Sequence, residues 1–383
     1  MGGLARPPCG DSMTRAVRVG SARIGGGAPI TVQSMTNTDT RDWESTSLQI
    51  RALADAGCDI VRVSVYDDEC VKASRAIIDA SPVPLVADVH FRTDLAIGAI
   101  ESGFAKLRIN PGNIGGEANV RRVADCAKAH GVPIRVGVNS GSLEKAMLAK
   151  HGRPTPEALA ESALSSARTL ERAGFDQIVI AAKSNNTADT ICAYRLLSKW
   201  CDYPLHLGVT EAGLPEDGVV KSAAAIGALL ADGIGDTLRV SLSGDPVPEA
   251  ETGIRILRAL GLRGGLDIIA CPTCGRACMD VASVAARVKA ALAAPRFAHI
   301  APNGPDGLFK VAVMGCVVNG PGEAREADIG VAGAPDGAAL FVKGESPVPV
   351  RGDPAQALID AIERRWGEPG SHPRETILKY ARG

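Results

Sequence analysis

The sequence predicts an α/β protein in which a (β/α)8 TIM barrel precedes a smaller α/β domain. From Ile30 onward, short Val- and Ile-rich runs alternate with amphipathic helical stretches, as expected of parallel strands joined by crossover helices. The alternation occurs eight times over roughly 240 residues, and a closed barrel typically needs about 250. A glycine-rich segment then separates this pattern from a shorter α/β pattern. An open, doubly wound sheet is the alternative for the first part.

Each predicted barrel strand is a short apolar run, and each predicted helix has apolar residues at helical spacing. Gly57, Gly131 and Gly174 follow helical patterns and are the expected left-handed helix stops. The strands are predicted at residues 30–35, 59–65, 84–90, 106–110, 133–139, 175–183, 204–210 and 236–241. The assigned helices include residues 45–56, 118–130, 156–173, 218–232 and 247–260.

The domain boundaries follow from this pattern. We expect residues 1–29 to form an N-terminal extension that caps the barrel, and residues 30–260 to form the barrel itself. Residues 261–265 are predicted to be a linker, and residues 266–383 a C-terminal domain. In that domain we expect further strands at residues 311–316, 329–332 and 339–343, with helices at residues 281–293 and 354–366.

Length and composition narrow the functional classes. The chain has 383 residues, more than one typical domain. Its 42 Lys and Arg against 43 Asp and Glu give a net charge of -1, so no overall basic field favours nucleic acid. No stretch reaches the roughly 20 apolar residues of a membrane helix, and residues 1–20 lack the apolar core of a signal peptide. We therefore expect a cytoplasmic protein without nucleic-acid or membrane partners.

Polar side chains interrupt one face of the predicted barrel strands. A strand buried on both faces is usually a continuous apolar run. Here Arg62 and Ser64 alternate with valines, so the two polar residues share one face. Other strands end in the same way, with the polar sets Asp88 and His90, Arg108 and Asn110, Arg135 and Asn139, Lys183, Thr210 and Glu211, and Arg239 and Ser241.

These polar residues lie near the carboxyl ends of the strands, where a barrel has its catalytic mouth. Any one of them has an ordinary explanation as a surface ion pair or a satisfied buried group. Several cations at one mouth would repel each other unless an anion lay among them, and guanidinium groups match phosphate oxygens. We infer a substrate with more than one phosphate group, held by Arg62, Arg108, Arg135, Lys183 and Arg239.

A set of cysteines in the last third of the chain is the second candidate site. Cys271 and Cys274 follow an apolar run at C-x-x-C spacing, and Cys316 follows another apolar run. A structural zinc ribbon normally has two such pairs, and here the second pair is missing. Cys278 would share a helix face with Cys274 if the helix began early, so an all-cysteine zinc site or cluster is an alternative. A thioredoxin-like redox pair fits less well, because no βαβ pattern begins here.

The sharper hypothesis is an iron–sulfur cluster with three thiolate ligands. Cys271, Cys274 and Cys316 would hold it, and the carboxylate of Glu323 would serve the fourth iron. The turn Asn-Gly-Pro-Gly at residues 319–322 can fold that carboxylate back. An oxygen ligand exchanges more readily than a thiolate, so a substrate oxygen could take its place.

Several long motifs carry a resemblance to a known family. They are Cys-Pro-Thr-Cys-Gly-Arg at residues 271–276, Val-Met-Gly-Cys-Val-Val-Asn-Gly-Pro-Gly-Glu-Ala at residues 313–324, and the segments 32–38, 107–113, 135–142 and 208–213. From about residue 31 to residue 332 the chain closely resembles the bacterial 4-hydroxy-3-methylbut-2-enyl diphosphate synthases, iron–sulfur enzymes of the non-mevalonate isoprenoid pathway.

The resemblance implies a TIM barrel and a small α/β iron–sulfur domain, with a 4Fe–4S cluster on Cys271, Cys274, Cys316 and Glu323. The implied reaction is the reductive ring opening and dehydration of 2-C-methyl-D-erythritol 2,4-cyclodiphosphate. Flavodoxin or ferredoxin would supply two electrons, and a head-to-tail homodimer is implied. The implied substrate contacts are Arg62, Arg108, Arg135, Asn139, Lys183, Thr210, Arg239 and Ser241, with Glu211 and His90 as unranked catalytic acids.

Two other classes of function remain open from the sequence. A non-catalytic phosphate-binding barrel with a structural zinc domain would use the same residues without redox chemistry. A barrel synthase such as a pterin-binding transferase would need no cysteine cluster.

Overall fold

The computed structural model describes residues 13–297, 299–300, 307–316, 324 and 326–367. They fall into two compact units, which meet in the sequence between Leu262 and Arg263, within the predicted linker. Within the described ranges, no helix has both the length and the apolar character needed to cross a membrane.

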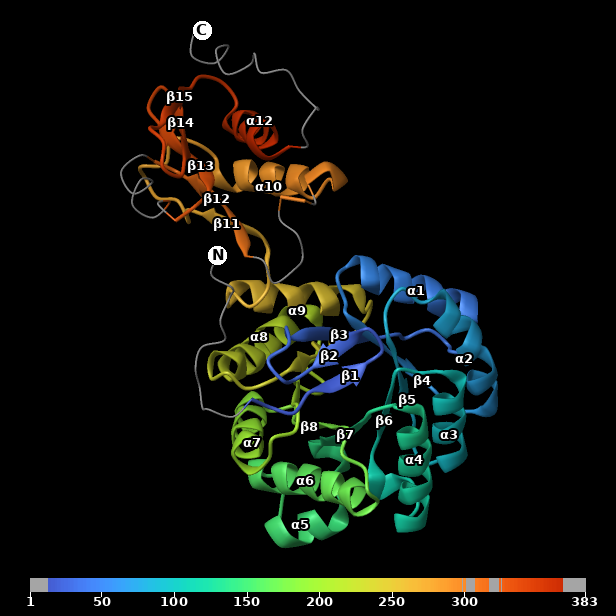
Figure 1. Ribbon diagram of the computed structural model, residues 1–383. Helices are drawn as coiled ribbons and strands as arrows, with labels where there is room; N and C mark the ends of the chain where they lie inside the picture. The colour runs from blue at the N-terminus through green and yellow to red at the C-terminus, as the bar shows by residue number, and fades with distance from the viewer. Residues whose placement is uncertain (1–12, 298, 301–306, 317–323, 325, 368–383) are drawn as a thin grey trace. The chain divides into compact units, whose positions relative to one another are not determined.

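The first unit is a barrel of eight parallel strands, so the doubly wound alternative is wrong (Figure 1). Neighbours in the sheet follow chain order from β3 to β8, and β10 pairs with both β3 and β9. A bridge from Ile180 to Leu205 closes the ring between β8 and β9. The strands are β3 (Thr31–Met35), β4 (Ile60–Ser64), β5 (Leu85–Asp88), β6 (Lys106–Ile109), β7 (Ile134–Asn139), β8 (Ile178–Lys183), β9 (His206–Leu207) and β10 (Thr237–Leu238).

Helices surround the barrel and alternate with its strands, as predicted (Figure 1). Gly131 ends α4 at a left-handed φ of 65°, and Gly57 and Gly174 also have positive φ just after their helices. The helices are α1 (Trp43–Asp55), α2 (Asp68–Ala80), α3 (Thr93–Ser102), α4 (Glu117–His130), α5 (Lys145–His151), α6 (Pro156–Arg172), α7 (Thr187–Trp200), α8 (Pro215–Ala231) and α9 (Val247–Ala259).

A hairpin before the barrel covers the amino-terminal ends of its strands. β1 (Val17–Val19) pairs antiparallel with β2 (Ala22–Ile24). Its buried side chains pack against Ile60, Val86 and Val179 in one apolar cluster. Ile60 lies two residues before Arg62 on the same strand face, so this cluster fills the lumen at the end opposite the polar mouth.

A side chain bridges β8 and β9, whose junction in the barrel we call the seam. The N–H of Ile180 donates to the carbonyl of Pro204 at 2.9 Å, and the N–H of Thr210 donates to that of Ser184 at 3.1 Å. Between these bonds, the hydroxyl of Tyr194 accepts from the N–H of Ala182 at 3.2 Å and donates to the carbonyl of His206. Because this hydroxyl replaces a direct ladder bond, β9 is shorter than the predicted residues 204–210.

The second unit is a mixed sheet covered on one face by two helices. β11 (Gly265–Ala270), β12 (Leu308–Met314) and β13 (Ile329–Ala334) are parallel, and β14 (Gly337–Val342) and β15 (Val348–Val350) continue the sheet antiparallel. Gly265, predicted as linker, begins β11. The helices α10 (Val281–Leu292) and α12 (Pro354–Trp366) bury an apolar core against the sheet.

Replacing Tyr194 by Phe tests the seam. The loss of the hydroxyl leaves the N–H of Ala182 and the carbonyl of His206 without their shared partner in a buried position, which should lower the free energy of unfolding by about 1–3 kcal/mol. Urea unfolding measures this. The control is Tyr66→Phe, which removes an exposed hydroxyl bond to Asp39 and should cost less. Equal stability of Tyr194→Phe and the wild type would mean that the strands close into a normal ladder without the hydroxyl.

Candidate active site

The register between strands places the predicted cations on one face of the sheet. Arg62 pairs with Met35 on one side and Val86 on the other, and Asp88 pairs with Arg108. Arg108 in turn pairs with Arg135. Residues paired in a parallel sheet point to the same side, so these side chains all enter the lumen. The alternation read from the sequence therefore identifies the lumen face.

Asp88 is the acidic centre of this cluster. Its carboxylate accepts from Nη1 of Arg108 at 3.0 Å and lies 3.8 Å from Nε of Arg62 and 3.5 Å from Nε2 of His90. Burial alone would raise the pKa of Asp88, but the charge of Arg62, the hydrogen bond from His90 and the charge of Arg108 together hold it well below its usual range. Asp88 therefore stays ionised and orients the two arginines.

Arg239 is held from the other side by a buried glutamate. Glu249 of α9 accepts from Nε and Nη2 of Arg239 at 3.1 and 3.2 Å, a two-bond fork. The same carboxylate accepts from the hydroxyl of Ser34 at 2.8 Å and the N–H of Leu242 at 3.0 Å. Arg239 consequently has a fixed orientation at the strand end, with Nη1 directed towards the sulfur of Met35 at 3.5 Å.

Met35 separates two of the guanidinium groups. Its sulfur accepts from Nε and Nη2 of Arg62 at 3.0 and 2.8 Å, and from Arg239 as described above. A thioether is a weak acceptor and carries no charge. The contacts with Met35 therefore position Arg62 and Arg239 without neutralising their charge, and an anion would bind these groups more strongly than the sulfur does. Burial lowers the pKa of Arg62 to about 10.

Arg135 and Lys183 are also buried. Their exposed fractions are 2% and 7%. Burial lowers the pKa of Arg135 below its ordinary value, and the charges of Arg62 and Arg108 add to this effect. Burial also lowers the pKa of Lys183, followed by the charges of Arg135 and Arg239. A negatively charged ligand would reverse these shifts.

Two glycines make room for the cations. A Cβ at Gly208 would lie 2.6 Å from Nζ of Lys183 and 2.4 Å from the carbonyl oxygen of Arg239. A Cβ at Gly137 would lie 3.3 Å from Nε of Arg108. Arg108 of β6 thus lies against Gly137 of β7, and Lys183 of β8 lies against Gly208, which follows β9.

The other predicted residues surround the open end. Asn139, Thr210 and Ser241 are half-buried, whereas His90 and Glu211 are exposed. Glu211 has a φ of 51°, and Phe91, next to His90, has a φ of 67°. Non-glycine residues with positive φ are strained and cluster at functional sites. Both candidate acids therefore stand at irregular backbone on the rim, and the geometry does not rank one above the other.

Sequence reasoning missed three polar residues deeper in the lumen. Lys106 and His206 are fully buried and Gln33 is 1% exposed. Lys106 lies two residues before Arg108, and Gln33 lies two residues before Met35, so both share the lumen face of their strands. The same alternation that identified the mouth could have found them, had it been followed towards the amino-terminal ends of the strands.

The cysteine loops leave one edge of the second unit's sheet. β11 and β12 are parallel neighbours with Ala270 paired to Val313, and the N–H of Cys271 donates to the carbonyl of Val313 at 3.0 Å. Cys271 and Cys274 follow β11, and Cys316 follows β12. The two loops, which follow separate apolar runs in the sequence, are thus adjacent. Cys274 is exposed, and Cys271 and Cys316 are half-buried.

Cys271, Cys274 and Cys316 have the chemistry to bind a metal cluster as thiolates. Their described side chains are not arranged around a common centre. Across the described ranges, no group of three or more Cys, His, Asp or Glu side chains is placed to hold a metal ion. Glu323, the predicted fourth ligand, lies outside the described residues. Thr273, between Cys271 and Cys274, has a φ of 66°, a conformation that turns the loop sharply.

The alternative ligand Cys278 does not lie on a helix with Cys274. α10 begins at Val281, and Asp280 caps it by accepting from the N–H of Ser283 at 3.0 Å. The prediction of a shared helix face is therefore wrong. Cys278 instead lies in the loop, exposed, where its N–H donates to the carbonyl of Gly315 at 2.8 Å.

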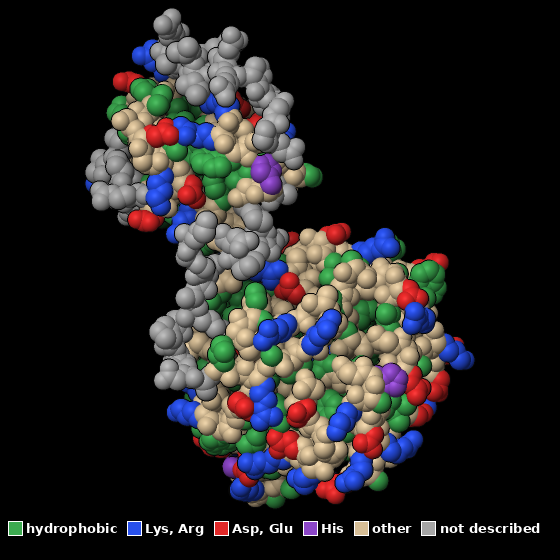
Figure 2. All heavy atoms as spheres, in the orientation of Figure 1, with side chains coloured by type: hydrophobic (Ala, Val, Ile, Leu, Met, Phe, Trp, Pro, Cys, Tyr) green, Lys and Arg blue, Asp and Glu red, His purple; other side chains and the backbone are tan. Residues whose placement is uncertain are grey.

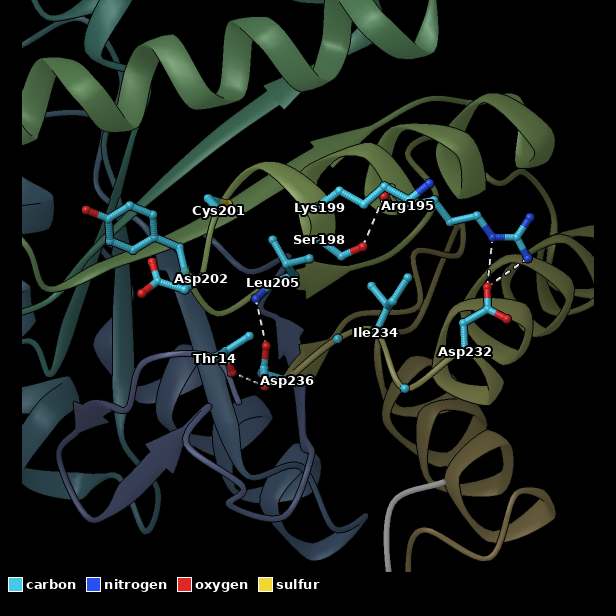
Figure 3. Close-up of a pocket in the computed structure, with 13 residues that line it drawn as sticks. Thr14, Arg195, Ser198, Lys199, Cys201, Asp202, Leu205, Asp232, Ile234 and Asp236 are labelled. Carbon is cyan, nitrogen blue, oxygen red and sulfur yellow. Dashed lines mark hydrogen bonds and ion pairs between the residues drawn. The ribbon is translucent and has the colours of Figure 1, made fainter. Parts of the chain in front are cut away.

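A cavity of about 420 Å³ at the opposite end of the barrel is a different feature (Figure 3). It lies where β9 and β10 begin, and several of its polar side chains already have hydrogen-bond or ion-pair partners. Asp236 accepts from Thr14 at 2.8 Å and from the N–H of Leu205 at 2.9 Å, and Arg195 pairs with Asp232 at 2.7 Å. Catalytic sites of TIM barrels lie at the carboxyl ends of the strands, so we do not assign this cavity to the site.

The fold and the site define a class: a TIM barrel with a cationic lumen, joined in one chain to an α/β unit with adjacent cysteine loops. Matches to protein families agree. The GcpE TIM-barrel domain matches residues 14–254, and the GcpE protein C-terminal domain matches residues 267–366. The chain belongs to the GcpE family.

Curated relatives match over nearly the whole chain. A protein of Caldanaerobacter subterraneus subsp. tengcongensis is 54% identical over 334 residues, which are 87% of this chain and 91% of that protein. One of Geobacter sulfurreducens is 52% identical over 358 residues, 93% of this chain and 98% of that protein. One of Lawsonia intracellularis is 55% identical over 333 residues, 87% and 90%. All three are named 4-hydroxy-3-methylbut-2-en-1-yl diphosphate synthase (flavodoxin).

Substituting Gly208 by Ala should disturb the cation cluster. Its new Cβ would collide with Lys183 and the Arg239 carbonyl, so the free energy of unfolding should fall by about 1–3 kcal/mol and anion binding should weaken. Gly213→Ala is the matched control, because Gly213 also has a positive φ, 107°, but open space around it. Urea unfolding and sulfate titration compare the two. Equal losses in both variants would show that backbone strain, and not the space beside Lys183, sets the requirement for glycine.

Proposed function

We propose that this protein catalyses the reductive ring opening and dehydration of 2-C-methyl-D-erythritol 2,4-cyclodiphosphate to (E)-4-hydroxy-3-methylbut-2-enyl diphosphate. The observation that carries the proposal is the lumen cluster of guanidinium and ammonium groups, in which Asp88 pairs with Arg62 and Arg108 and Glu249 pairs with Arg239. The names of the GcpE-family relatives support the same reaction.

The barrel residues would bind and orient the cyclic diphosphate. Its two phosphoryl groups each carry one negative charge at neutral pH, and Arg62, Arg108 and Arg239 already present fixed donors for them. Arg135 and Lys183 add charge from deeper in the lumen. We assign Asn139, Thr210 and Ser241 to the rim contacts. Holding the diphosphate in this way leaves the carbon skeleton directed away from the cations, towards the open mouth.

The proposed redox group is a 4Fe–4S cluster held by Cys271, Cys274, Cys316 and Glu323. When bound, such a cluster supplies electrons one at a time and offers an iron with an exchangeable oxygen ligand. The adjacency of the loops after β11 and β12 supports the three thiolates. Flavodoxin or ferredoxin would deliver the electrons, and we propose a homodimeric, cytoplasmic enzyme.

Protons for the departing water would come from the rim. His90 contacts both Asp88 and Arg108, so its ring is oriented by the same network that orients the arginine. Glu211 stands on the rim at strained backbone. Both side chains are exposed at the open end of the barrel, and pH–rate profiles of His90→Gln and Glu211→Gln would distinguish them.

Anaerobic purification of Cys316→Ala tests the cluster. The wild type should be brown with broad absorption near ~400 nm, and conversion of the cyclic to the linear diphosphate should be visible by phosphorus NMR. Cys316→Ala should lose both the colour and the turnover. Cys278→Ser, a neighbouring exposed thiol, is the control and should keep both. A colourless, zinc-loaded wild type would instead support the phosphate-binding barrel with a structural zinc domain.

Replacing Arg135 by Gln tests the barrel separately. The buried guanidinium is expected to contribute a charged hydrogen bond, so substrate affinity should fall roughly 10- to 100-fold. The absorption of the cluster should not change. Unaltered affinity would remove Arg135 from the substrate site.

A further inference from the structure

A second layer of polar side chains lies in the lumen beneath the cation cluster. It contains Lys106 of β6, His206 of β9, Gln33 and Thr31 of β3, and Thr237 of β10, which we call the lower layer. Thr237 pairs in register with both Thr31 and His206, so these three lie at one level of the lumen. Beneath them is the apolar cluster of the β1–β2 hairpin. All five side chains are at least nine-tenths buried.

The polar side-chain atoms of the lower layer lack hydrogen-bond partners among the described residues. Neither ring nitrogen of His206, neither side-chain amide atom of Gln33, and not Nζ of Lys106 has a hydrogen-bond partner among the described residues. The same holds for the hydroxyls of Thr31 and Thr237. Lumen positions in TIM barrels are usually filled by branched apolar residues, which would avoid the cost of these groups. Stability therefore does not account for the choice of residues here.

The charges around Lys106 are mainly of its own sign. Burial lowers the pKa of Lys106 below its ordinary value, and the charges of Arg135 and Arg62 lower it further. The two carboxylates nearby are already engaged by arginines. The charged or titratable groups directed into the lumen around Lys106 are Arg62 of β4, Asp88 of β5, His90 after β5, Arg108 of β6, Arg135 of β7, Lys183 of β8, His206 of β9, Arg239 after β10 and Glu249 of α9.

We propose that Lys106 is a buried proton acceptor, whose protonated fraction rises when a doubly charged oxyanion occupies the cation cluster. The lone pair of Nζ takes one proton from the solvent, and no bond of the ligand changes. The proton enters from the mouth, because the hairpin closes the other end of the lumen. Lys106 then adds a positive charge behind the ligand without touching it. For the cyclic diphosphate this rests on the proposed function; for other oxyanions it does not.

The sign of the pH dependence follows from linkage. A bound dianion raises the pKa of Lys106 from its lowered value in the free protein. Between the free and the bound values, binding takes up a proton, so affinity falls as pH rises, by about tenfold per pH unit for one proton. Above the bound value and below the free value the contribution of Lys106 is constant. Sulfate and the cyclic diphosphate have no group that titrates near neutral pH, so the protein supplies the effect.

Calorimetric titration of the full-length protein with sulfate measures the proton uptake. Binding heats in two buffers of different ionisation enthalpy give the number of protons bound with the ligand. We expect about one more proton in the wild type than in Lys106→Met, together with a flatter pH dependence in the variant. Lys106→Met should unfold at the same temperature as the wild type or higher, because it removes an unpartnered buried amine. Lys221→Met, on the exposed surface of α8, should behave as the wild type.

Proton uptake measured in the variant His206→Gln tests whether Lys106 or His206 accepts the proton. Full proton uptake in Lys106→Met would overturn the proposal, as would its loss in His206→Gln alone, which would assign the proton to His206. Failure of both sulfate and the cyclic diphosphate to bind the wild type would also overturn it. If sulfate binds with proton uptake and the cyclic diphosphate does not bind, the proposed substrate is wrong and the role of Lys106 stands.

Discussion

Positive charge enclosed in a barrel is the constraint on which the rest of the first unit depends. Moving a charged group out of water costs several kcal/mol even after relaxation. Arginines and lysines of β4, β6, β7 and β8, and Arg239 just after β10, point into the lumen. Asp88 and Glu249 form ion pairs with only some of them. Such an arrangement persists only if the strands cannot separate. The helices, the hairpin and the closed ring of strands supply that restraint, and the uncompensated charge is what a phosphorylated ligand would bind.

On the face of the barrel drawn in Figure 2, basic and acidic side chains are interspersed, in keeping with the net charge of -1. The lumen cations lie away from bulk water, which strengthens their field. A charge count over the whole sequence cannot reveal such a site, whereas the alternation within individual strands does.

Much of the barrel and its mouth was predictable because both depend on local periodicity. Two-residue alternation placed Arg62, Arg108 and Arg135 on one face, and the register between strands agrees. The insertion of Tyr194 into the β8–β9 seam was not predictable, because it depends on the distance between α7 and two strands. Lys106 and His206 lie within apolar runs, and only the strand alternation, followed towards the amino-terminal ends, would have distinguished them from core residues. In the second unit, β15 contains Pro349 in three residues and gives almost no strand signal.

The β1–β2 hairpin determines by which end of the barrel molecules enter and leave the lumen. Since its valines and Ile24 seal one end of the lumen, the mouth is both entrance and exit. Product and the water released in the reaction must therefore depart by the path that the next substrate takes, and successive turnovers cannot overlap in one barrel.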